Sequence, residues 1–382
     1  MENFSLANPV KIIFGEGMIK EITNEIPQGS KVLMTYGGGS IKKNGVYDQA
    51  VKALSGYEWH EFGGIEPNPH YETCMKAIAV IKEKGIDFIL SVGGGSVLDA
   101  TKFISAAVYF EEGDPWQILS KGSKVKKAMP FGDIITLPAT GSEMNSGAVI
   151  TRAETQEKLA FGSPLTHPKF SVLDPTVTYS LPARQTGNGV VDAFVHVMEQ
   201  YLTYNEGNSL LQDNMAEAIV KTLVEEGPKA LKEPNNYDVR ANLMWASTWA
   251  LNGWIACGVP EDWATHMIGH ELTAFYGLDH AQTLAIVLPG VMRVLKDQKG
   301  KKITRLGKEV FGIQGNDAID RTIKAVENFF ESVGVKTHLS DYGLGDEAIN
   351  KVAERLGNRG WKLGECHNIT ADVIKDILTL RK

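Results

Sequence analysis

The stretch DFILSVGGGSVLDATK, residues 87–102, contains the parts of a β–α unit in order. The apolar run at 87–92 predicts a buried strand, and the apolar spacing after Ser96 predicts a helix. Between them, Gly93, Gly94 and Gly95 let a ligand approach the main chain and leave the first N–H groups of the helix available. Because a helix N-terminus favours an anion, the stretch predicts a site for the pyrophosphate of a dinucleotide.

Two more apolar runs predict buried strands, KVLMTY at 31–36 and DIITLP at 133–138. Segments with helical spacing, such as ETCMKAIAVIKEKG, lie between the runs. This alternation predicts a Rossmann-like α/β domain, in which helices cover both faces of a parallel sheet. YGGGS at 36–40 repeats the glycine-rich turn after a strand. Neither turn is a strict GxGxxG, so each alone also fits a structural connector, but two at successive strand ends favour a dinucleotide.

Beyond residue 182 the strand signals fade, and apolar residues recur every three or four positions. A chain of 382 residues is long enough for two cores. We therefore expect two domains: a dinucleotide-binding α/β domain at 1–182, and an all-helical domain for metal and substrate at 183–382.

Composition limits the classes of function. No apolar run reaches the length of about 18 residues that a membrane helix needs. The N-terminus lacks the layout of a signal peptide, so we expect a cytoplasmic protein. The net charge is −7 and no long basic block is present, which argues against a nucleic-acid partner.

Two loops indicate how the nucleotide is recognised. An NAD site usually places an acidic side chain on the adenine ribose. YGGGSIKKNG instead offers Ser40, Lys42 and Lys43, which favours NADP(H) over NAD(H). In TLPATGSEMN, the hydroxyl groups of Thr136, Thr140 and Ser142 can donate to phosphate or to the nicotinamide amide, or can simply cap a turn.

The helical segment VVDAFVHVMEQYL carries Asp192, His196 and Glu199 on one face, at positions i, i+4 and i+7. Burying such groups without partners costs about 1 to 3 kcal/mol or more each. A buried cation would satisfy the carboxylate and the imidazole together.

A second group of histidines lies in ATHMIGHELTAFYGLDHAQ, where His266 and His270 share a helix face and His280 follows Gly277. Singly, each histidine also fits a hydrogen-bonded core residue. As a set with Asp192, they suit Zn2+ or Fe2+ with one position left open. The HExxH pattern of zinc peptidases fails at Ala274.

GGGSVLDATK, LPATGSEMN, VVDAFVHVMEQY and HMIGHELTAFYGLDHAQTLAIVLP together make the chain resemble the iron-dependent (group III) alcohol dehydrogenases over nearly its whole length. It looks closest to the bacterial NADPH-dependent aldehyde reductase and butanol dehydrogenase branch. The resemblance implies the fold shared with dehydroquinate synthase, with cofactor and metal held between the two domains.

The resemblance also implies the site residues. By position, the metal ligands fall on Asp192, His196, His266 and His280, with His270 close to substrate and nicotinamide. Ala281 departs from the glycine that many members have after the last ligand. The implied cofactor contacts are Gly37, Gly38, Ser40, Asn68, Gly94, Gly95, Ser96, Asp99, Thr136, Leu137, Thr140, Ser142 and Lys158.

These features predict a metal-dependent alcohol dehydrogenase that transfers hydride between NADP(H) and short aldehydes or primary alcohols, mainly as an aldehyde reductase. His270, or a water that it holds, is the candidate proton donor. Trp254, Trp263 and Phe275 either narrow the substrate pocket or belong to the core. Family resemblance implies a homodimer. The alternatives are a dehydroquinate synthase-like lyase and a noncatalytic dinucleotide sensor.

Overall fold

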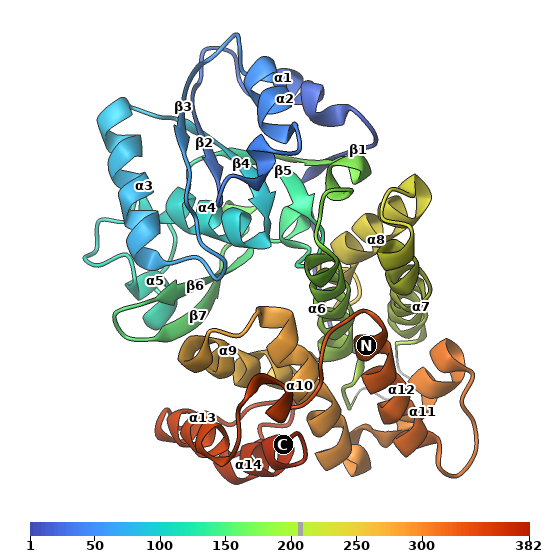
Figure 1. Cartoon of the computed structure of the whole chain (residues 1–382). Helices are drawn as coiled ribbons and strands as arrows, with labels where there is room; N and C mark the ends of the chain where they lie inside the picture. Colours follow the sequence, from blue (N-terminus) through green and yellow to red (C-terminus); the bar gives the residue numbers. More distant parts are fainter. Residues whose placement is uncertain (205–208) are drawn as a thin grey trace. The chain divides into compact units, whose positions relative to one another are not determined.

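The computed structural model describes residues 1–204 and 209–382. These residues pack into two compact units. The sheet unit comprises Ala7–Leu181 and Pro234–Thr248, and the helical unit comprises Met1–Leu6, Pro182–Glu233 and Trp249–Lys382. In Figure 1 the strands of the sheet unit are blue to green, and most helices of the helical unit are green to red.

The two units follow the chain except at two segments. The chain leaves the sheet unit at Leu181, close to the expected boundary, but Met1–Leu6 pack in the helical unit. Pro234–Thr248 pack in the sheet unit, because Met244 is buried in the same core as Leu33 and Ile89 of the sheet. The assignment of nucleotide binding to 1–182 and of metal and substrate binding to 183–382 stays a prediction.

A six-stranded sheet forms the centre of the sheet unit, and all its neighbouring strands are parallel. The strand order is β1-β8-β5-β4-β2-β3. The predicted strands are confirmed as β2, β4 and β5, and so is the α/β class. The strands are β1 (Lys11–Phe14), β2 (Lys31–Tyr36), β3 (Glu58–Phe62), β4 (Phe88–Gly94), β5 (Phe131–Leu137) and β8 (Phe170–Leu173).

Helices cover both faces of this sheet. On one face, Leu33 and Ile89 pack with α3 (Tyr71–Lys84) and α4 (Gly95–Ala107). On the other, Val32 and Met34 pack with η1, α1 and α2. The central strands are therefore apolar on both sides, which explains their continuous apolar runs. The remaining elements before the hairpin are η1 (Met18–Glu21), α1 (Ile22–Glu25), η2 (Ser40–Lys42), α2 (Val46–Ala53), α5 (Gln117–Ser120) and η3 (Ser142–Met144).

An antiparallel hairpin was not expected from the sequence. Strands β6 (Gly147–Arg152) and β7 (Glu157–Gly162) pair with each other and form a separate two-stranded sheet. Most residues of both strands are half-buried or exposed, and neither strand shows the continuous apolar run of the central strands. Two short 3-10 helices, η4 (Pro164–Thr166) and η5 (Pro175–Thr178), flank β8.

The described residues after Leu181 contain helices and no β-strand, as predicted. The longest buried segment is α6, nearly all of whose residues from Thr186 onward are buried. It packs against α7 and α10. The helices are α6 (Ala183–Tyr201), α7 (Leu210–Lys232), α8 (Tyr237–Ala250), α9 (Ala264–Tyr276), α10 (His280–Val294), α11 (Lys296–Phe311), α12 (Ala318–Ser332), η6 (Ser340–Tyr342), α13 (Asp346–Asn358) and α14 (Ala371–Thr379).

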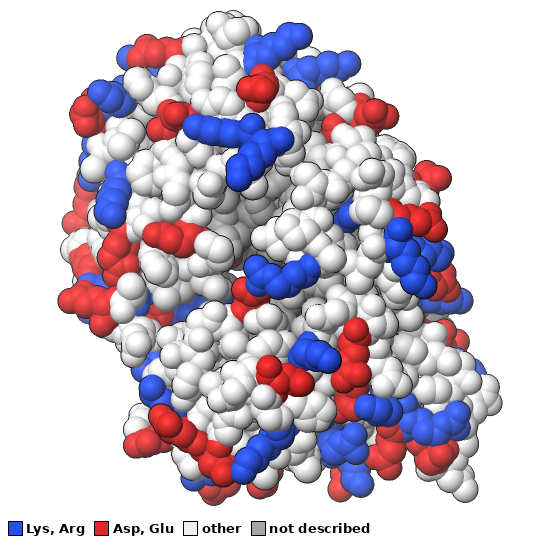
Figure 2. All heavy atoms as spheres, in the orientation of Figure 1, with Lys and Arg blue, Asp and Glu red and all other residues white. Residues whose placement is uncertain are grey.

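None of the described helices is both long and apolar enough to cross a membrane. On the face drawn in Figure 2, basic and acidic side chains are interspersed over both units. Fields from neighbouring charges of opposite sign largely cancel in such an arrangement.

Candidate metal centre and nucleotide-binding loops

Helix α6 supplies two of the predicted metal ligands. Asp192 and His196 are one turn apart and both are buried. Glu199 follows on the same face and is also buried. The opposite stripe of α6 is apolar and packs into the core, so the fold of the helix fixes the direction of these polar side chains.

The N-terminal ends of α9 and α10 supply the other two predicted ligands. His266 lies in the first turn of α9, and His280 is the first residue of α10. Gly277 ends α9 with a φ of 69°, a left-handed conformation that glycine adopts without strain. Asp279 then caps α10 through a capping box with Gln282.

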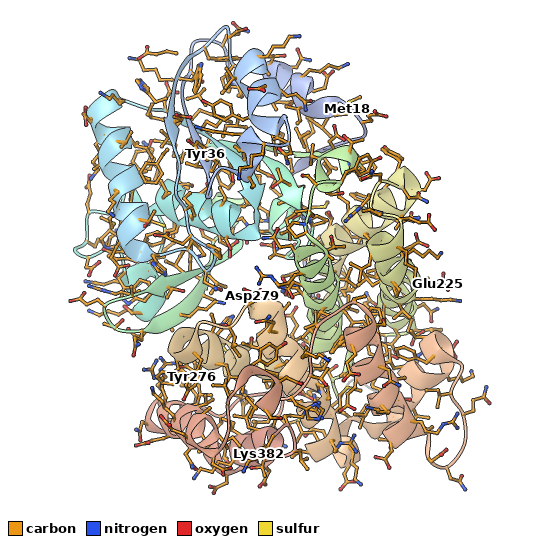
Figure 3. The ribbon with its side chains drawn as sticks, in the orientation of Figure 1. Met18, Tyr36, Glu225, Tyr276, Asp279 and Lys382 are labelled. Atoms are coloured by element: carbon orange, nitrogen blue, oxygen red, sulfur yellow. The ribbon has the colours of Figure 1, made fainter. Side chains whose placement is uncertain are left out.

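Asp279 also ties the start of α10 to α6. Its carboxylate, labelled in Figure 3, accepts hydrogen bonds from Arg184 and from the amide of Asn188, which lies 2.9 Å away. Both donors are on α6. The residue that immediately precedes His280 is therefore held against the helix that carries Asp192.

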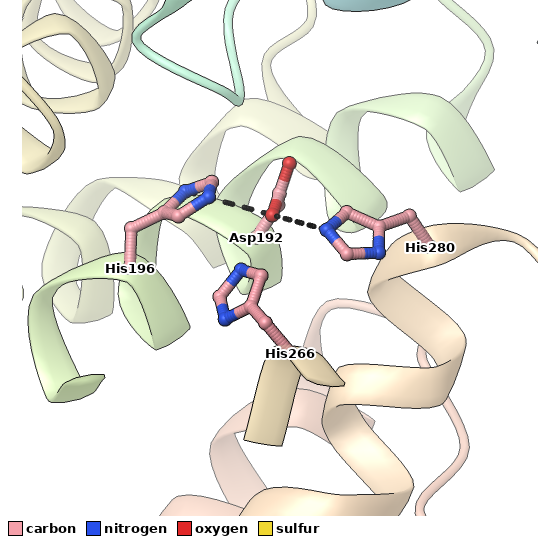
Figure 4. A group of neighbouring side chains, drawn as sticks. All are labelled: Asp192, His196, His266 and His280. Atoms are coloured by element: carbon pink, nitrogen blue, oxygen red, sulfur yellow. Dashed lines mark ion pairs between the residues drawn. The ribbon is translucent and has the colours of Figure 1, made fainter. Parts of the chain in front are cut away.

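The four predicted ligands converge on one point (Figure 4). One ligand atom from each of Asp192, His196, His266 and His280 lies within 4.8 Å of all the others. The Oδ1 atom of Asp192 is 3.5 Å from Nδ1 of His196 and 3.7 Å from Nε2 of His280. The ring of His266 has its centroid 4.7 Å from that of His196 and 5.2 Å from that of His280.

This donor set fits a divalent transition metal. Bonds of about 2.1 Å in a tetrahedral site place the ligand atoms about 3.4 Å apart, close to the two distances from Asp192. Three imidazoles of intermediate softness and one harder carboxylate suit Fe2+ and Zn2+ alike. With a +2 ion at their centre, the carboxylate charge and the imidazole nitrogens would all be compensated.

Glu199 orients one of the ligands, a role not assigned to it from the sequence. Its Oε1 atom accepts the backbone N–H of His266 at 2.9 Å and lies 3.0 Å from Nδ1 of the same residue. With Nδ1 engaged in this way, Nε2 of His266 is directed to the ligand cluster. Burial raises the pKa of Glu199 well above its ordinary value, and the nearby Asp262 carboxylate raises it further.

His270 is adjacent to the cluster but is not one of its four members. It lies one turn after His266 on α9 and is buried. Its ring centroid is 5.4 Å from that of His280 and 6.3 Å from that of His266. This is where a group that exchanges protons with a ligand of the metal would lie, and the role of His270 stays a prediction.

Three aromatic residues were expected either to narrow the substrate pocket or to belong to the core, and their surroundings differ. The ring of Trp263 lies beside the ligands, with its centroid 5.1 Å from that of His266. Phe275 packs at the edge of a core cluster under the guanidinium of Arg355, 3.7 Å from the ring centroid. Trp254 is 41% exposed and packs on Trp249.

In the sheet unit, the two glycine-rich turns follow β2 and β4, which are neighbours in the sheet. The chain runs from β2 outward to β3 and then returns to β4 on the other side of β2. Ligands of α/β sheets bind at such a switch point, beyond the carboxyl ends of the strands. A Cβ atom at Gly95, the first residue of α4, would lie 2.5 Å from Thr140 Cγ2, so this turn requires glycine.

Several predicted cofactor contacts are linked to each other around this switch point. The ammonium of Lys158 donates to Oδ1 of Asn68 at 2.9 Å, and the backbone N–H of Asn68 donates to the Ser96 hydroxyl at 3.3 Å. Ser96 lies in the first turn of α4. The structure thus brings residues from three distant parts of the sequence together.

Asp99 lies beyond the first turn of α4, and its side chain does not cap that helix. Its carboxylate accepts hydrogen bonds from the Ser142 hydroxyl at 2.7 Å and from the Val149 N–H at 2.9 Å. Burial raises the pKa of Asp99. Asp99 therefore holds the loop between β5 and β6, where Ser142 and Thr140 lie.

Lys102 is a buried residue that the sequence analysis missed. Its ammonium donates to Ser142 Oγ at 2.7 Å, to Asn145 Oδ1 at 2.9 Å and to the Gly147 carbonyl at 2.8 Å. Burial lowers its pKa to about 8. In the sequence, this lysine is indistinguishable from one on a solvated helix face.

Lys42 has an acidic neighbour that its own loop does not contain. Its ammonium lies over the rings of Tyr36 and Tyr47, at 4.9 and 4.6 Å from their centroids, and 3.4 Å from Oε2 of Glu61 at the end of β3. The Tyr47 hydroxyl donates to the same oxygen at 2.8 Å. The lysine head is therefore positioned beside the turn that follows β2.

Comparison with known proteins gives a consistent assignment for both units. A family described as "Iron-containing alcohol dehydrogenase" matches residues 9–175, and one described as "Fe-containing alcohol dehydrogenase family, C-terminal" matches residues 186–380. The NADPH-dependent aldehyde reductase YqhD of Escherichia coli K12 is 56% identical over 383 residues, which cover 99% of each chain.

Solved structures agree with this assignment. A crystal structure of E. coli K-12 YqhD superposes with a TM-score of 0.97 and 54% identity, covering 100% of this chain and 99% of the other. The NADH-dependent butanol dehydrogenase A of Thermotoga maritima superposes with a TM-score of 0.94 and 39% identity, with coverage of 100% and 99%.

Proposed function

Because the chain belongs to the iron-containing alcohol dehydrogenase family, we propose that it is a metal-dependent alcohol dehydrogenase that works mainly as an NADPH-dependent reductase of short aldehydes. The observation that carries the proposal is the convergence of Asp192, His196, His266 and His280 on one buried point. A noncatalytic dinucleotide sensor has no need of such a ligand set. The comparisons give no support to the dehydroquinate synthase-like alternative.

The reaction requires two groups that the chain itself lacks. When bound, a divalent cation supplies a Lewis acid that polarises the carbonyl of the substrate, and NADPH supplies the hydride. Asp192 and the three imidazoles hold the cation, and Glu199 fixes the ring of His266. Asp192, His196 and His266 are buried, and electrostatic stabilisation is stronger where water is largely excluded.

His270 is the proposed proton donor to the product oxygen. Its imidazole is next to that of His280, and imidazole titrates near neutral pH. The proton moves from a ring nitrogen of His270, directly or through one water, and is replaced from solvent after the product leaves.

NADP(H) is the proposed cofactor for two reasons. The relative with 56% identity is named as NADPH-dependent, whereas the structural relative named as NADH-dependent is only 39% identical. In addition, Lys42 and Lys43 follow the turn after β2, where they can attract a 2′-phosphate. Gly37, Gly38, Ser40, Asn68, Gly94, Gly95, Ser96, Asp99, Thr136, Leu137, Thr140, Ser142 and Lys158 are proposed to form or support this site.

Three further features remain proposals. We assign nucleotide binding to residues 1–182 and metal and substrate binding to residues 183–382. We also propose a homodimer and a cytoplasmic location. Size-exclusion chromatography with light scattering tests the oligomeric state.

Removal of the metal tests the proposed function. Purified protein is treated with a chelator, dialysed, and assayed for oxidation of NADPH by butanal, before and after Fe2+ or Zn2+ is restored. We expect turnover to disappear and return while NADPH binding, measured by its fluorescence, persists throughout. Full turnover by protein shown to be free of metal contradicts the proposal.

A further inference from the structure

A buried lysine on α11 joins three segments that are distant in sequence. The side chain of Lys299 is 1% exposed. Its ammonium donates to the Leu202 carbonyl at 2.5 Å, to Asp262 Oδ2 at 2.8 Å and to both carboxylate oxygens of Glu365 at 3.0 Å. A buried ammonium needs such partners, and here all three of its protons have them.

Two of these partners mark the ends of the helices that carry the metal ligands. Leu202 is the C-cap residue that directly follows α6, so its carbonyl lies at the end of the helix that carries Asp192 and His196. Asp262 lies two residues before Ala264, the first residue of the helix that carries His266. The Lys299 ammonium thus lies between the end of α6 and the start of α9.

Asp262 connects Lys299 to the predicted ligand residues through further hydrogen bonds. Its Oδ1 atom accepts the N–H of Ala264 at 2.9 Å, and its own N–H donates to the carbonyl of Glu199 at 2.8 Å. Oε1 of Glu199 in turn accepts the backbone N–H of His266 and lies 3.0 Å from Nδ1 of its ring. A continuous series of hydrogen bonds therefore runs from Lys299 through Asp262 and Glu199 to a ring that faces the metal centre.

The backbone between Asp262 and Ala264 is in a conformation that needs such support. Trp263 has a φ of 60° and ψ of 6°, in the left-handed region that a residue with a side chain rarely adopts. Its ring packs against His266 and also lies 6.3 Å, centroid to centroid, from His196. If Asp262 moves, both the strained turn and the aromatic wall beside two ligands move with it.

We propose that Lys299 is a positioning residue of the metal centre, which acts through Asp262 to fix the Trp263 turn and the orientation of His266. The inference rests on the proposed function, because it assumes that Asp192, His196, His266 and His280 hold a metal ion. A buried ion pair is also compatible with a role in stability alone. For stability alone, however, apolar residues of similar volume can replace such a pair without loss of stability. What an apolar residue cannot do is hold the end of α6 and the carboxylate of Asp262 in one fixed geometry.

The test compares two lysines of the same helix. Lys299→Met removes the tie, and Lys302→Met is the matched control, because Lys302 is also buried but pairs with Asp213 of α7. The zinc-loaded holoenzymes are mixed with excess chelator, and the rate of metal release is followed together with the thermal midpoint. Partners that orient metal ligands typically contribute 10- to 100-fold to affinity, so we expect release from Lys299→Met about tenfold faster or more. Release from Lys302→Met should match the wild type even where its thermal midpoint falls.

Equal release rates in the two variants would show that Lys299 only stabilises the fold, and would overturn the inference. If Lys299→Met does not fold, metal release is measured from Asp262→Asn instead. This change keeps the shape of the side chain and weakens its bond to Lys299. Accelerated release supports the inference and an unchanged rate overturns it. In folded proteins, the double variant should release metal no faster than Lys299→Met alone, because both changes break one series of bonds. A wild-type chain that binds no metal would instead refute the proposed function.

Discussion

Nδ1 of His266 lies 3.0 Å from Oε1 of Glu199, and the same oxygen accepts the backbone N–H of His266. A carboxylate on α6 thereby fixes both the start of α9 and the orientation of a ligand ring. The geometry of the candidate metal centre thus depends on more residues than its four predicted ligands.

Replacing Glu199 by glutamine should weaken metal binding while leaving the ligands in place. The amide is uncharged and increases the basicity of His266 less than a carboxylate does, so we expect metal affinity to fall about 10- to 100-fold. Competition with a chromogenic chelator measures this affinity. Glu217→Gln is the control, because Glu217 is buried on α7 and pairs with Arg305. Equal affinities in the two variants would show that Glu199 has no special role.

His270→Ala should lower kcat about 100-fold or more, in the range that general acid catalysis contributes, with the metal content unchanged. Metal analysis of the purified variant and steady-state rates with NADPH and butanal separate the two effects. The variant should also lose a titration near neutral pH from its kcat profile. Loss of the metal would reassign His270 as a ligand.

Lys42→Ala should raise the KM for NADPH by about tenfold, as expected when a charged hydrogen bond to phosphate is lost, and leave the KM for NADH nearly unchanged. Steady-state rates at varied concentrations of NADPH and of NADH give the two KM values and their ratio. Lys52→Ala, at the end of α2, controls for the general loss of one positive charge. An equal rise in the KM for both nucleotides would show that Lys42 does not recognise the 2′-phosphate.

Glu365 makes the stability of the protein depend on pH. Burial and the Asp262 carboxylate raise its pKa from 4.5 to about 7, although the Lys299 ammonium opposes them. The folded chain therefore keeps a proton that the unfolded chain loses, so stability falls as the pH rises from about 4.5 to about 7. Asp262, whose pKa is lowered, and Lys299, whose pKa is raised, keep their charges in this window.

Glu365→Gln should remove this dependence, worth about 1 to 2 kcal/mol between pH 5 and pH 8 after screening by solvent is allowed for. Thermal midpoints of the wild type and the variant at both pH values provide the comparison. We expect the thermal midpoint of the variant, relative to that of the wild type, to be higher at pH 8 than at pH 5. The same difference at both pH values would mean that Glu365 titrates outside the window.

The strands that could be predicted are those whose apolar sequence pattern matches their burial in the sheet. β2, β4 and β5 are covered on both faces, so their continuous apolar runs revealed them. The hairpin β6–β7 was missed because its strands are only partly buried and show no such run. The place of Pro234–Thr248 in the sheet unit depends on packing of Met244, which no local pattern contains.

The same distinction applies to the candidate site. Asp192 and His196 are one turn apart in a helix that is otherwise apolar on its buried stripe, so their spacing was informative. Lys299, Asp262 and Glu365 are far apart in sequence, and nothing near any of them indicates the others. No local pattern distinguishes Lys102 from a surface lysine, and only the folded chain shows its three acceptors.

All four predicted metal ligands come from the helical unit, whereas the glycine-rich turns belong to the sheet unit. We therefore expect the protein to take up the metal ion in the absence of nucleotide, because no predicted ligand belongs to the unit that carries the predicted nucleotide site.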